Sequence, residues 1–296
     1  MRIVVCAKQV LDPDAVNNYA LAGKLEIGAD GKTLTQAAIP RLMNAYDEQA
    51  IEAALRLRDA GATCTIAVVS LGRDSTDILK HAAALGVDEV ACIAVEASSV
   101  DAHGTACLLA AYIRQSGGAD LVLCGRQASD DDQGVVPALI GERLGMPTVT
   151  IARAVELVQA SGAPAVRVTR VTPDGDEVVE ARCPAVITIS NEIGTPRYPT
   201  AAKRMTARRV QPKMFSADDL SVRAEDLQPH VKLVRQFVPT VQGKCEILSG
   251  ATPAEVADRL IARLRAESVI QLSQESPRHD VTRGCCLHLG WTARRR

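Results

Sequence analysis

Hydrophobic and polar positions follow two alternating periods along the first 150 residues. Short apolar runs typical of buried strands are RIVVCAKQV, CTIAVVSL, VDEVACIAV and ADLVLCG. Segments with apolar residues every three to four positions, typical of helices, are NAYDEQAIEAALRLRDAG, DSTDILKHAAALG, DAHGTACLLAAYIRQ and QGVVPALIGERLG. Strands that alternate with helices of this length build a parallel sheet covered on both faces. The pattern therefore predicts a doubly wound α/β domain.

Residues at the helix ends support this prediction. Asn44 is a good N-cap, Asp47 and Glu48 suit the first turn of the same helix, and Gly61 can end it. Gly145 ends the last of the predicted helices in the same way. We therefore expect Asn44 to be the N-cap of the helix that follows it.

The period changes after residue 150. Further strand candidates are TIARAVELV, AVRVTRV, DEVVEARC and PAVITIS, and the residues PDG between the second and the third are typical of a hairpin turn. We expect these strands to form an antiparallel edge added to the mostly parallel sheet.

Strand signals fade from about residue 191. TPRYPTAAKRMTARRVQPK is basic and has no apolar period, which is typical of a solvated connection or of an arm lying on a partner. TPAEVADRLIARLRAESVI predicts a helix, capped by Thr252, with Pro253 in its first turn. The pattern thus divides the chain into an α/β domain (1–190), an extended arm plus helix (191–275) and a tail typical of disorder (276–296).

Composition excludes several classes of partner. Thirty-four basic and thirty-five acidic residues leave a formal net charge of -1, so no overall field attracts nucleic acid or an anionic membrane. The longest apolar runs are far below the roughly 20 residues that span a bilayer, and the first apolar run is too short for a signal peptide. We expect a cytoplasmic protein with no membrane insertion and no nucleic-acid partner.

The nine cysteines do not predict a disulfide framework. Cysteines inside or beside apolar runs behave as small hydrophobic residues, and here these are Cys6, Cys64, Cys92, Cys124 and Cys183. One cluster, RGCCLHLG, holds Cys285, Cys286 and His288. Adjacent cysteines lack the spacing of zinc sites, so we expect no metal there, and the role of this cluster stays open.

The stretch GRQASDDDQGVVP places three carboxylates between a predicted strand and a predicted helix. Ligands of open α/β sheets bind outside the carboxyl ends of the strands, where a helix start offers N–H groups to phosphate. Consecutive side chains diverge, which disfavours an octahedral Mg²⁺ site, and neither G-x-G-x-x-G nor the full P-loop motif G-x-x-x-x-G-K-[ST] is present. A solvated helix start, a Mg²⁺ site and a nucleotide site all remain open from these residues alone.

Several motifs in one order resemble the β subunit of electron transfer flavoproteins, also called the FixA family. RLMNAYDEQAIEAALRLRDAG is similar to the family's N-P-x-[DC]-E-x-A-[IV]-E helix, and LCGRQASDDD resembles its L-G-[KR]-Q-A-I-D-D-D loop. VVCAKQVLDP, EVVEARCPAVITIS and TPRYPT also match in order, so that the likeness covers roughly residues 1–215. The α/β fold that the family implies agrees with the pattern.

The resemblance implies an electron carrier without catalytic residues of its own. Such β subunits form a heterodimer with an α subunit that holds the redox-active FAD, and they bind AMP or, in electron-bifurcating members, a second FAD. Flavin-containing dehydrogenases, such as those for acyl-CoA, would reduce the FAD, which passes electrons towards a quinone reductase. The helix beyond residue 252 would pack on the α subunit. Whether bifurcation occurs, and which dehydrogenase donates, stays open.

By position, the resemblance implies a nucleotide site built from strand ends and helix starts. Its residues are Cys6, Ala7, Asn44, Ala45, Tyr46, Asp47, Leu71, Gly72, Gly125, Arg126, Gln127, Ala128, Ser129, Asp130, Asp131, Asp132, Gln133, Gly134, Val135, Val136 and Pro137. Where members read N-Q-T-G or A-Q-V-G-P after the aspartates, this chain reads G-V-V-P. Backbone N–H groups would then hold the phosphate, and AMP is favoured over FAD.

The resemblance also implies a loop that docks the partner dehydrogenase through a leucine. The matching stretch is NEIGTPRY, in which Ile193 falls at the position of the leucine. The alternative to a carrier is an adenine-nucleotide hydrolase that uses Asp130, Asp131 and Asp132 to bind Mg²⁺. Lys8 and Arg126 lie outside any glycine-rich phosphate loop, which such an enzyme would need.

Overall fold

The computed structural model describes residues 1–35, 37–160, 162–238 and 245–270. The chain divides into two compact units, Met1–Val238 and Pro239–Arg296. Residues 191–238, which the sequence pattern assigns to the arm, thus belong to the first unit. The tail cluster of Cys285, Cys286 and His288 lies outside the described residues.

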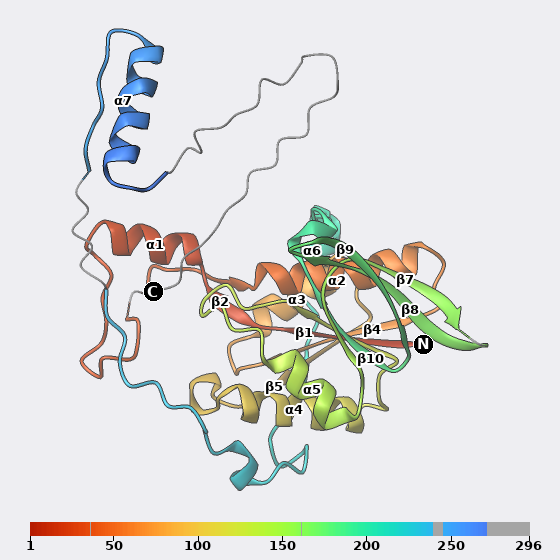
Figure 1. The fold of residues 1–296 in the computed structure, drawn as a ribbon. Coiled ribbons are helices and arrows are strands. Elements are labelled where there is room, and N and C mark those ends of the chain that lie inside the picture. Colours follow the sequence, from red (N-terminus) through yellow and green to blue (C-terminus); the bar gives the residue numbers. More distant parts are fainter. Residues whose placement is uncertain (36, 161, 239–244, 271–296) are drawn as a thin grey trace, which may run out of the picture. The chain divides into compact units, whose positions relative to one another are not determined.

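Within the described residues, a nine-stranded sheet runs through the first unit in the order β11-β5-β4-β1-β6-β10-β7-β8-β9 (Figure 1). The strands are β1 (Arg2–Ala7), β4 (Thr65–Leu71), β5 (Glu89–Ile93), β6 (Leu121–Gly125), β7 (Thr148–Ala160), β8 (Ala163–Thr172), β9 (Gly175–Arg182), β10 (Ala185–Ile189) and β11 (Lys213–Phe215). Neighbours from β11 to β7 pair in parallel, whereas β7, β8 and β9 pair antiparallel. The predicted fold class is therefore confirmed.

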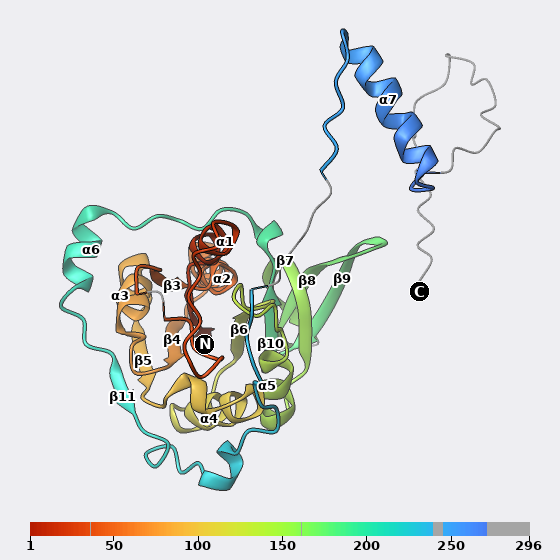
Figure 2. The ribbon, with the colours of Figure 1, turned by 90° about the vertical axis from the view of Figure 1, so that its left-hand side faces the viewer.

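Helices cover both faces of the parallel part of the sheet, as Figure 2 shows. One face carries α2 (Ala45–Asp59) and α3 (Thr76–Leu85), and the other carries α4 (Ala102–Gln115) and α5 (Val136–Leu144). Each side of the sheet has its own apolar layer, which contains Ile51 and Leu79 on the first face and Leu108 and Ile140 on the second. Burial of these apolar stripes is what holds the helices against the sheet.

One detail of the predicted antiparallel edge is wrong. PAVITIS forms β10, which lies inside the sheet and pairs in parallel with both β6 and β7. All five residues of β10 are buried. A continuous apolar run is typical of a parallel strand buried on both faces, whereas the mostly exposed strand β9 contains four charged residues.

Several short elements have no counterpart in the sequence prediction. They are β2 (Gln9–Leu11), α1 (Pro13–Leu21), β3 (Arg41–Met43), α6 (Ala201–Ala207), β11 and the 3₁₀ turns Ala97–Ser99, Asn191–Ile193 and Ala224–Leu227. β11 pairs in parallel with β5, and α6 lies against α3. The basic stretch after residue 191 is therefore held to the first unit at both points rather than forming a free arm.

In the second unit, α7 (Pro253–Ala266) is the predicted helix. The Thr252 hydroxyl accepts a hydrogen bond from the Glu255 N–H at 3.2 Å, which confirms the predicted cap. No residue of α7 is buried.

Two further expectations concern the described residues as a whole. The seven cysteines among them are all free, and they include the five that the apolar runs predict as unpaired. Among these residues, the structure contains no helix with both the length and the apolar character needed to cross a membrane.

Candidate functional site

The predicted site lies where the order of the strands reverses. β4 and β5 lie on one side of β1, and β6 and β10 lie on the other, so the chain changes direction in the sheet between β1 and β6. Open α/β sheets bind ligands at such a switch point, outside the carboxyl ends of the strands. The topology thus selects the same edge of the sheet as the sequence motifs.

The parallel register gathers the predicted strand ends at this edge. Cys6 pairs with Cys124 across β1 and β6, and Ala7 pairs with Ser70 across β1 and β4. The start of α2 and the loop of residues 125–137 lie at the same edge, because Asn44 and Asp47 are hydrogen-bonded to Gln127 and Gly125. The predicted residues at strand ends, helix start and loop are therefore brought together.

Asn44 joins the start of α2 to the loop of residues 125–137. Its side-chain N–H donates to the Gln127 carbonyl oxygen at 2.9 Å, and its Oδ1 accepts from the Ser129 N–H at 3.1 Å. Asn44 is the N-cap residue of α2, as predicted, but its side chain makes no capping hydrogen bond to the helix. Asn44 is only 2% exposed, and its side chain is hydrogen-bonded to the loop of residues 125–137 rather than to α2.

Asp47 ties the same helix to two strand ends. Its carboxylate accepts from the Lys8 N–H at 2.7 Å and from the Gly125 N–H at 2.9 Å. Burial raises the pKa of Asp47 to about 6, although hydrogen bonds from Lys8, Gly125 and Asn44 act to lower it. Only neutral N–H groups bond the Asp47 carboxylate, so they do not balance its charge. Its pKa therefore stays above the ordinary value.

Two glycines allow the loop to approach its supports closely. A Cβ atom on Gly125 would lie 2.5 Å from Asp47 Oδ1 and 2.6 Å from Tyr46 Cβ. A Cβ atom on Gly134 would lie 2.4 Å from the Arg126 carbonyl oxygen. No side chain fits at either position without movement of the backbone, so glycine is required there for a steric reason.

Lys8 contacts two of the three consecutive aspartates. Its Nζ lies 2.7 Å from Asp130 Oδ1 and 3.3 Å from Asp131 Oδ2. Asp132 adopts a left-handed φ of 55° and accepts a hydrogen bond from the Gln127 side chain at 3.0 Å. All three carboxylates thus take part in ion pairs or hydrogen bonds with other side chains. Lys8 was not among the predicted site residues, because the contact joins positions that are 122 residues apart.

The start of α5 offers unpaired backbone donors. Val135 precedes the helix without a side-chain cap, and its first turn has no acidic residue. Among the described residues, no acceptor is bonded to the N–H groups of Val136 and Ala138. Free N–H groups at the start of a helix form a site for phosphate.

Two buried hydroxyl groups at this edge also lack partners. Ser129 Oγ and Ser70 Oγ are buried and have no hydrogen-bond partner among the described residues. Buried polar atoms are ordinarily paired, so these two are available to a ligand or to water. The sequence analysis did not select Ser70. A serine near the end of the apolar run TIAVVSL could have marked it as a candidate.

The residues present therefore fit a bound nucleotide. Arg126 stacks its guanidinium on the Tyr46 ring at 5.3 Å, which gives the loop a planar, cationic surface beside α2. Residues 130–135 are exposed and accessible to a ligand. The loop thus combines free N–H groups at the start of α5 with an unpaired hydroxyl on Ser129.

Ile193, the predicted docking residue, is not part of this site. Its side chain is 9% exposed and belongs to the apolar layer that includes α2. A docking anchor has to be accessible to its partner. The docking role stays a prediction, and the burial of Ile193 speaks against it because the turn Asn191–Ile193 would have to open.

Comparison with known proteins identifies the family of the chain. Residues 32–220 match the family described as "Electron transfer flavoprotein domain". The chain is 32% identical over 276 residues to the "Caffeyl-CoA reductase-Etf complex subunit CarD" of Acetobacterium woodii, covering 91% of this chain and 100% of that one. It is 33% identical, with the same coverage, to the "Electron transfer flavoprotein subunit beta" of Clostridium acetobutylicum.

A third relative is named as part of a reductase complex. It is the "Acryloyl-CoA reductase electron transfer subunit gamma" of Anaerotignum propionicum, to which the chain is 30% identical over 287 residues, covering 91% of this chain and 100% of that one. The family match spans more than half of the chain, and these relatives are matched over their full length. The chain therefore belongs to the family of electron transfer flavoprotein β subunits.

Proposed function

We propose that the chain is the β subunit of a heterodimeric electron transfer flavoprotein in the cytoplasm. It carries electrons from acyl-CoA or similar flavin-containing dehydrogenases towards a quinone reductase. The observation that carries the proposal is the joining of loop 125–137 to the start of α2, through Asn44 and Asp47, at the switch point of the sheet. The names of two relatives include a CoA-ester reductase, which supports a partner that acts on CoA esters.

The nucleotide in this subunit is proposed to be AMP rather than a second FAD. The N–H groups of Val136 and Ala138 hold its phosphate, and Ser129 Oγ supplies a further hydrogen bond. FAD, held mainly by the α subunit, supplies the electron-accepting chemistry. The residues of the β subunit bind and orient, and they move neither protons nor electrons in this proposal.

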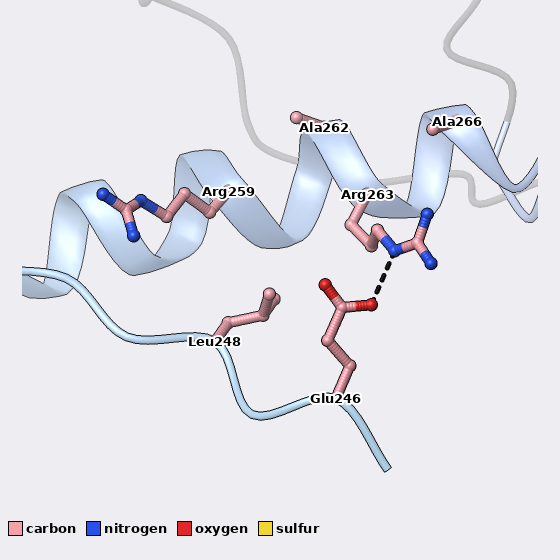
Figure 3. A pocket seen from close by; sticks show the side chains of 6 residues that line it. All are labelled: Glu246, Leu248, Arg259, Ala262, Arg263 and Ala266. Carbon is pink, nitrogen blue, oxygen red and sulfur yellow. Dashed lines mark hydrogen bonds and ion pairs between the residues drawn. The ribbon is translucent and has the colours of Figure 1, made fainter. Parts of the chain in front are cut away.

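The second unit is proposed to pack on the α subunit. Leu260 and Ile261 on α7 are 46% and 38% exposed, which leaves an apolar surface without cover. Figure 3 shows the hollow beside α7, lined by Glu246, Leu248, Arg259, Ala262, Arg263 and Ala266. Glu246 pairs with Arg263 at 2.7 Å, so the segment before α7 is tied to the helix. An amphipathic helix of this kind is suited to a groove on a partner.

A truncation tests this packing. A chain that ends at Val238 should no longer copurify with the α subunit, and the pair Leu260→Asp and Ile261→Asp should weaken the heterodimer in the full chain. Arg265→Asp, on the same helix, is the control and should leave the heterodimer intact. A stable heterodimer with the truncated chain would contradict the proposed contact.

No observation favours the hydrolase. The Lys8 ammonium contacts both Asp130 and Asp131, where a metal ion would have to bind. Within the described ranges, no three His, Cys, Asp or Glu side chains are grouped to hold a metal ion. The carboxylates that Mg²⁺ would need are thus engaged in the loop itself.

Coexpression with an α-type subunit tests the proposed function. The heterodimer should be yellow and should accept electrons from an acyl-CoA dehydrogenase that a saturated acyl-CoA has reduced. The isolated chain should not hydrolyse ATP. Failure to form a flavin-containing heterodimer, or turnover of ATP by the isolated chain, would contradict the proposal.

A further inference from the structure

Buried side chains at the start of α2 hold the loop of residues 125–137 as far as Ser129. The Asp47 carboxylate accepts a hydrogen bond from the Gly125 N–H at 2.9 Å, and Asn44 Oδ1 accepts one from the Ser129 N–H at 3.1 Å. Asp47 and Asn44 are both buried. The first part of the loop is therefore fixed to the domain from inside.

Residues 130–134 are attached in a different way. All five are exposed, and the bonds of their backbone N–H groups, such as that of Asp132 to the Ala128 carbonyl oxygen at 2.9 Å, stay within the loop. Among the described residues, their only hydrogen bonds or ion pairs to a group outside the loop are those of Asp130 and Asp131 with Lys8 Nζ, at 2.7 and 3.3 Å. This part of the loop thus depends on one side chain.

Lys8 has a position that does not depend on the loop. It lies between β1 and β2, its backbone N–H donates to the Asp47 carboxylate at 2.7 Å, and its carbonyl oxygen accepts from the Asn44 N–H at 2.9 Å. The start of α2 therefore fixes the Lys8 backbone, from which the ammonium group reaches the two aspartates.

Residues 130–134 connect the groups that are proposed to hold the nucleotide. Ser129, with its unpaired hydroxyl, comes directly before them, and the N–H groups of Val136 and Ala138 follow at the start of α5. The position of residues 130–134 therefore sets how the hydroxyl lies relative to these N–H groups. A contact that holds residues 130–134 in place acts on the nucleotide without touching it.

The contact with Lys8 is suited to opening and closing. The side chains of Lys8, Asp130 and Asp131 are 44%, 34% and 43% exposed. Ion pairs at such exposed positions contribute little to folding stability and are screened by salt. Loss of the ammonium would also leave two uncompensated negative charges on a loop that is proposed to bind phosphate. We therefore expect the contact to affect retention of an anionic ligand far more than folding.

We propose that Lys8 is a positioning residue that keeps the loop of residues 125–137 in the form that retains the nucleotide. Its ammonium group holds Asp130 and Asp131, and release of the nucleotide requires this contact to open. Lys8 contacts the loop and not the nucleotide. The inference rests on the proposed function and adds to it a salt-sensitive step in nucleotide release.

Lys8→Met in the complete heterodimer tests the proposal. The substitution removes the charge, while the backbone bond of residue 8 to Asp47 does not depend on the side chain. Heterodimer loaded with radiolabelled AMP is diluted into unlabelled AMP, and release should be about fivefold faster than in the wild type at low salt, the most that an exposed ion pair supplies. The ratio of the two rates should fall to about one in roughly 1 M salt, because salt opens the contact in the wild type.

Hydrogen exchange gives a measurement that needs no nucleotide. In the nucleotide-free heterodimer, the backbone amides of residues 130–134 should exchange about fivefold faster in Lys8→Met than in the wild type. Lys8→Arg, which keeps the positive charge, should restore both slow release and slow exchange.

Arg167→Met is the matched control. Arg167 is 46% exposed and, like Lys8, lies near two carboxylates, those of Glu156 at 3.9 Å and Glu180 at 2.8 Å. It belongs to the hairpin of β8 and β9, outside the loop. This variant should therefore release AMP at the wild-type rate and leave exchange of residues 130–134 unchanged.

A double-mutant cycle separates positioning from direct binding of phosphate by Lys8. In a heterodimer with Asp130→Asn and Asp131→Asn, the Lys8 side chain has no carboxylate of the loop to hold. Adding Lys8→Met to these two substitutions should then change the rate of AMP release by less than about twofold. Release that is again about fivefold faster would show that Lys8 acts on the nucleotide itself, and would overturn the positioning role.

The wild type distinguishes failure of the inference from failure of the proposed function. A wild-type heterodimer that retains no AMP overturns the proposed nucleotide, and this inference with it. A wild type that retains AMP, together with unchanged release or unchanged exchange in Lys8→Met, overturns the inference alone.

Discussion

Two buried carboxylates on the same helix have pKa values that are shifted in opposite directions. Asp47 and Glu52 are 6% and 5% exposed, and both join α2 to a distant segment. Burial raises the pKa of Asp47 to about 6. Burial also acts to raise the pKa of Glu52, but hydrogen bonds from Arg197 and Arg56 outweigh it and lower the pKa below its ordinary value.

The difference lies in the partners rather than in the burial. Asp47 is bonded mainly by neutral backbone N–H groups, whereas Glu52 is bonded by two guanidinium groups. Neutral donors satisfy a carboxylate without balancing its charge. One end of α2 therefore supports loop 125–137 with a group that titrates near pH 6, and its middle supports segment 191–198 with a group that stays ionised.

Gly125→Ala should break the Asp47 attachment with the largest effect. The added Cβ would lie 2.5 Å from Asp47 Oδ1 and 2.8 Å from the Tyr46 carbonyl carbon. Forcing the start of α2 away from β6 should lower the free energy of unfolding by about 3 kcal/mol, as overpacking of buried sites does. Urea denaturation measures this change, and a loss below about 1 kcal/mol would contradict the close approach.

Glu52→Gln should destabilise the first unit by about 2 kcal/mol, because hydrogen bonds to charged partners contribute roughly 1.5–3 kcal/mol. The lowered pKa of Glu52 means that its contribution is present above pH 4.5, its ordinary value, and is lost as the pH falls through the folded-state pKa. The variant should therefore lose part of the acid sensitivity of the wild type. The midpoints of urea unfolding of both proteins, measured as the pH falls below 4.5, test this. If stability falls equally with pH in the wild type and in the variant, the ion pairs of Glu52 do not contribute.

Asp47→Asn should change the pH dependence of the free energy of unfolding in the direction opposite to that of Glu52→Gln. Because the folded-state pKa is raised from 3.8 to about 6, the contribution of Asp47 is fully present below pH 3.8 and falls as the pH rises through 6. Between about pH 5 and about pH 7, this loss amounts to roughly 1 kcal/mol. The Asn variant should lack this loss, and a wild-type slope in the variant would show that Asp47 does not titrate there.

Ser129→Ala should have the smallest effect on folding, below about 0.5 kcal/mol, because Ser129 Oγ has no partner among the described residues. If the hydroxyl bonds a nucleotide, the variant should instead release the nucleotide faster during dialysis. Ser99→Ala, whose hydroxyl bonds only the Glu96 backbone outside the site, is the control. Equal retention in both variants would remove Ser129 from the site.

Much of the fold was predictable because the periods of strands and helices are local. β1, β4, β5 and β6 are continuous apolar runs, and α2 to α5 carry apolar stripes with glycine or a polar residue at their ends. β10 and β11 were harder to place. The pairing of β10 depends on the long hairpin that precedes it, and β11 has three residues and no apolar period.

The meeting of the strand ends with the loop of residues 125–137 was predictable, but the individual contacts there were not. Strand ends and the loop of residues 125–137 follow from the α/β pattern and the motifs. The roles of Asn44, Lys8 and Ser70 depend on residues far away in the sequence. Asn44 is the N-cap of α2, as its local sequence predicts, but its side chain bonds a distant loop. Ile193 was assigned by its place in a motif, and only packing reveals that its side chain is buried.

The nucleotide content of the heterodimer tests the central claim most directly. Acid extraction followed by chromatography should release one FAD and one AMP per heterodimer, and Asn44→Ala, which removes both bonds to the loop, should lower the AMP but not the FAD. Two FAD molecules per heterodimer would contradict the assignment of AMP. A heterodimer that releases one FAD and no other nucleotide would contradict the site at loop 125–137 altogether.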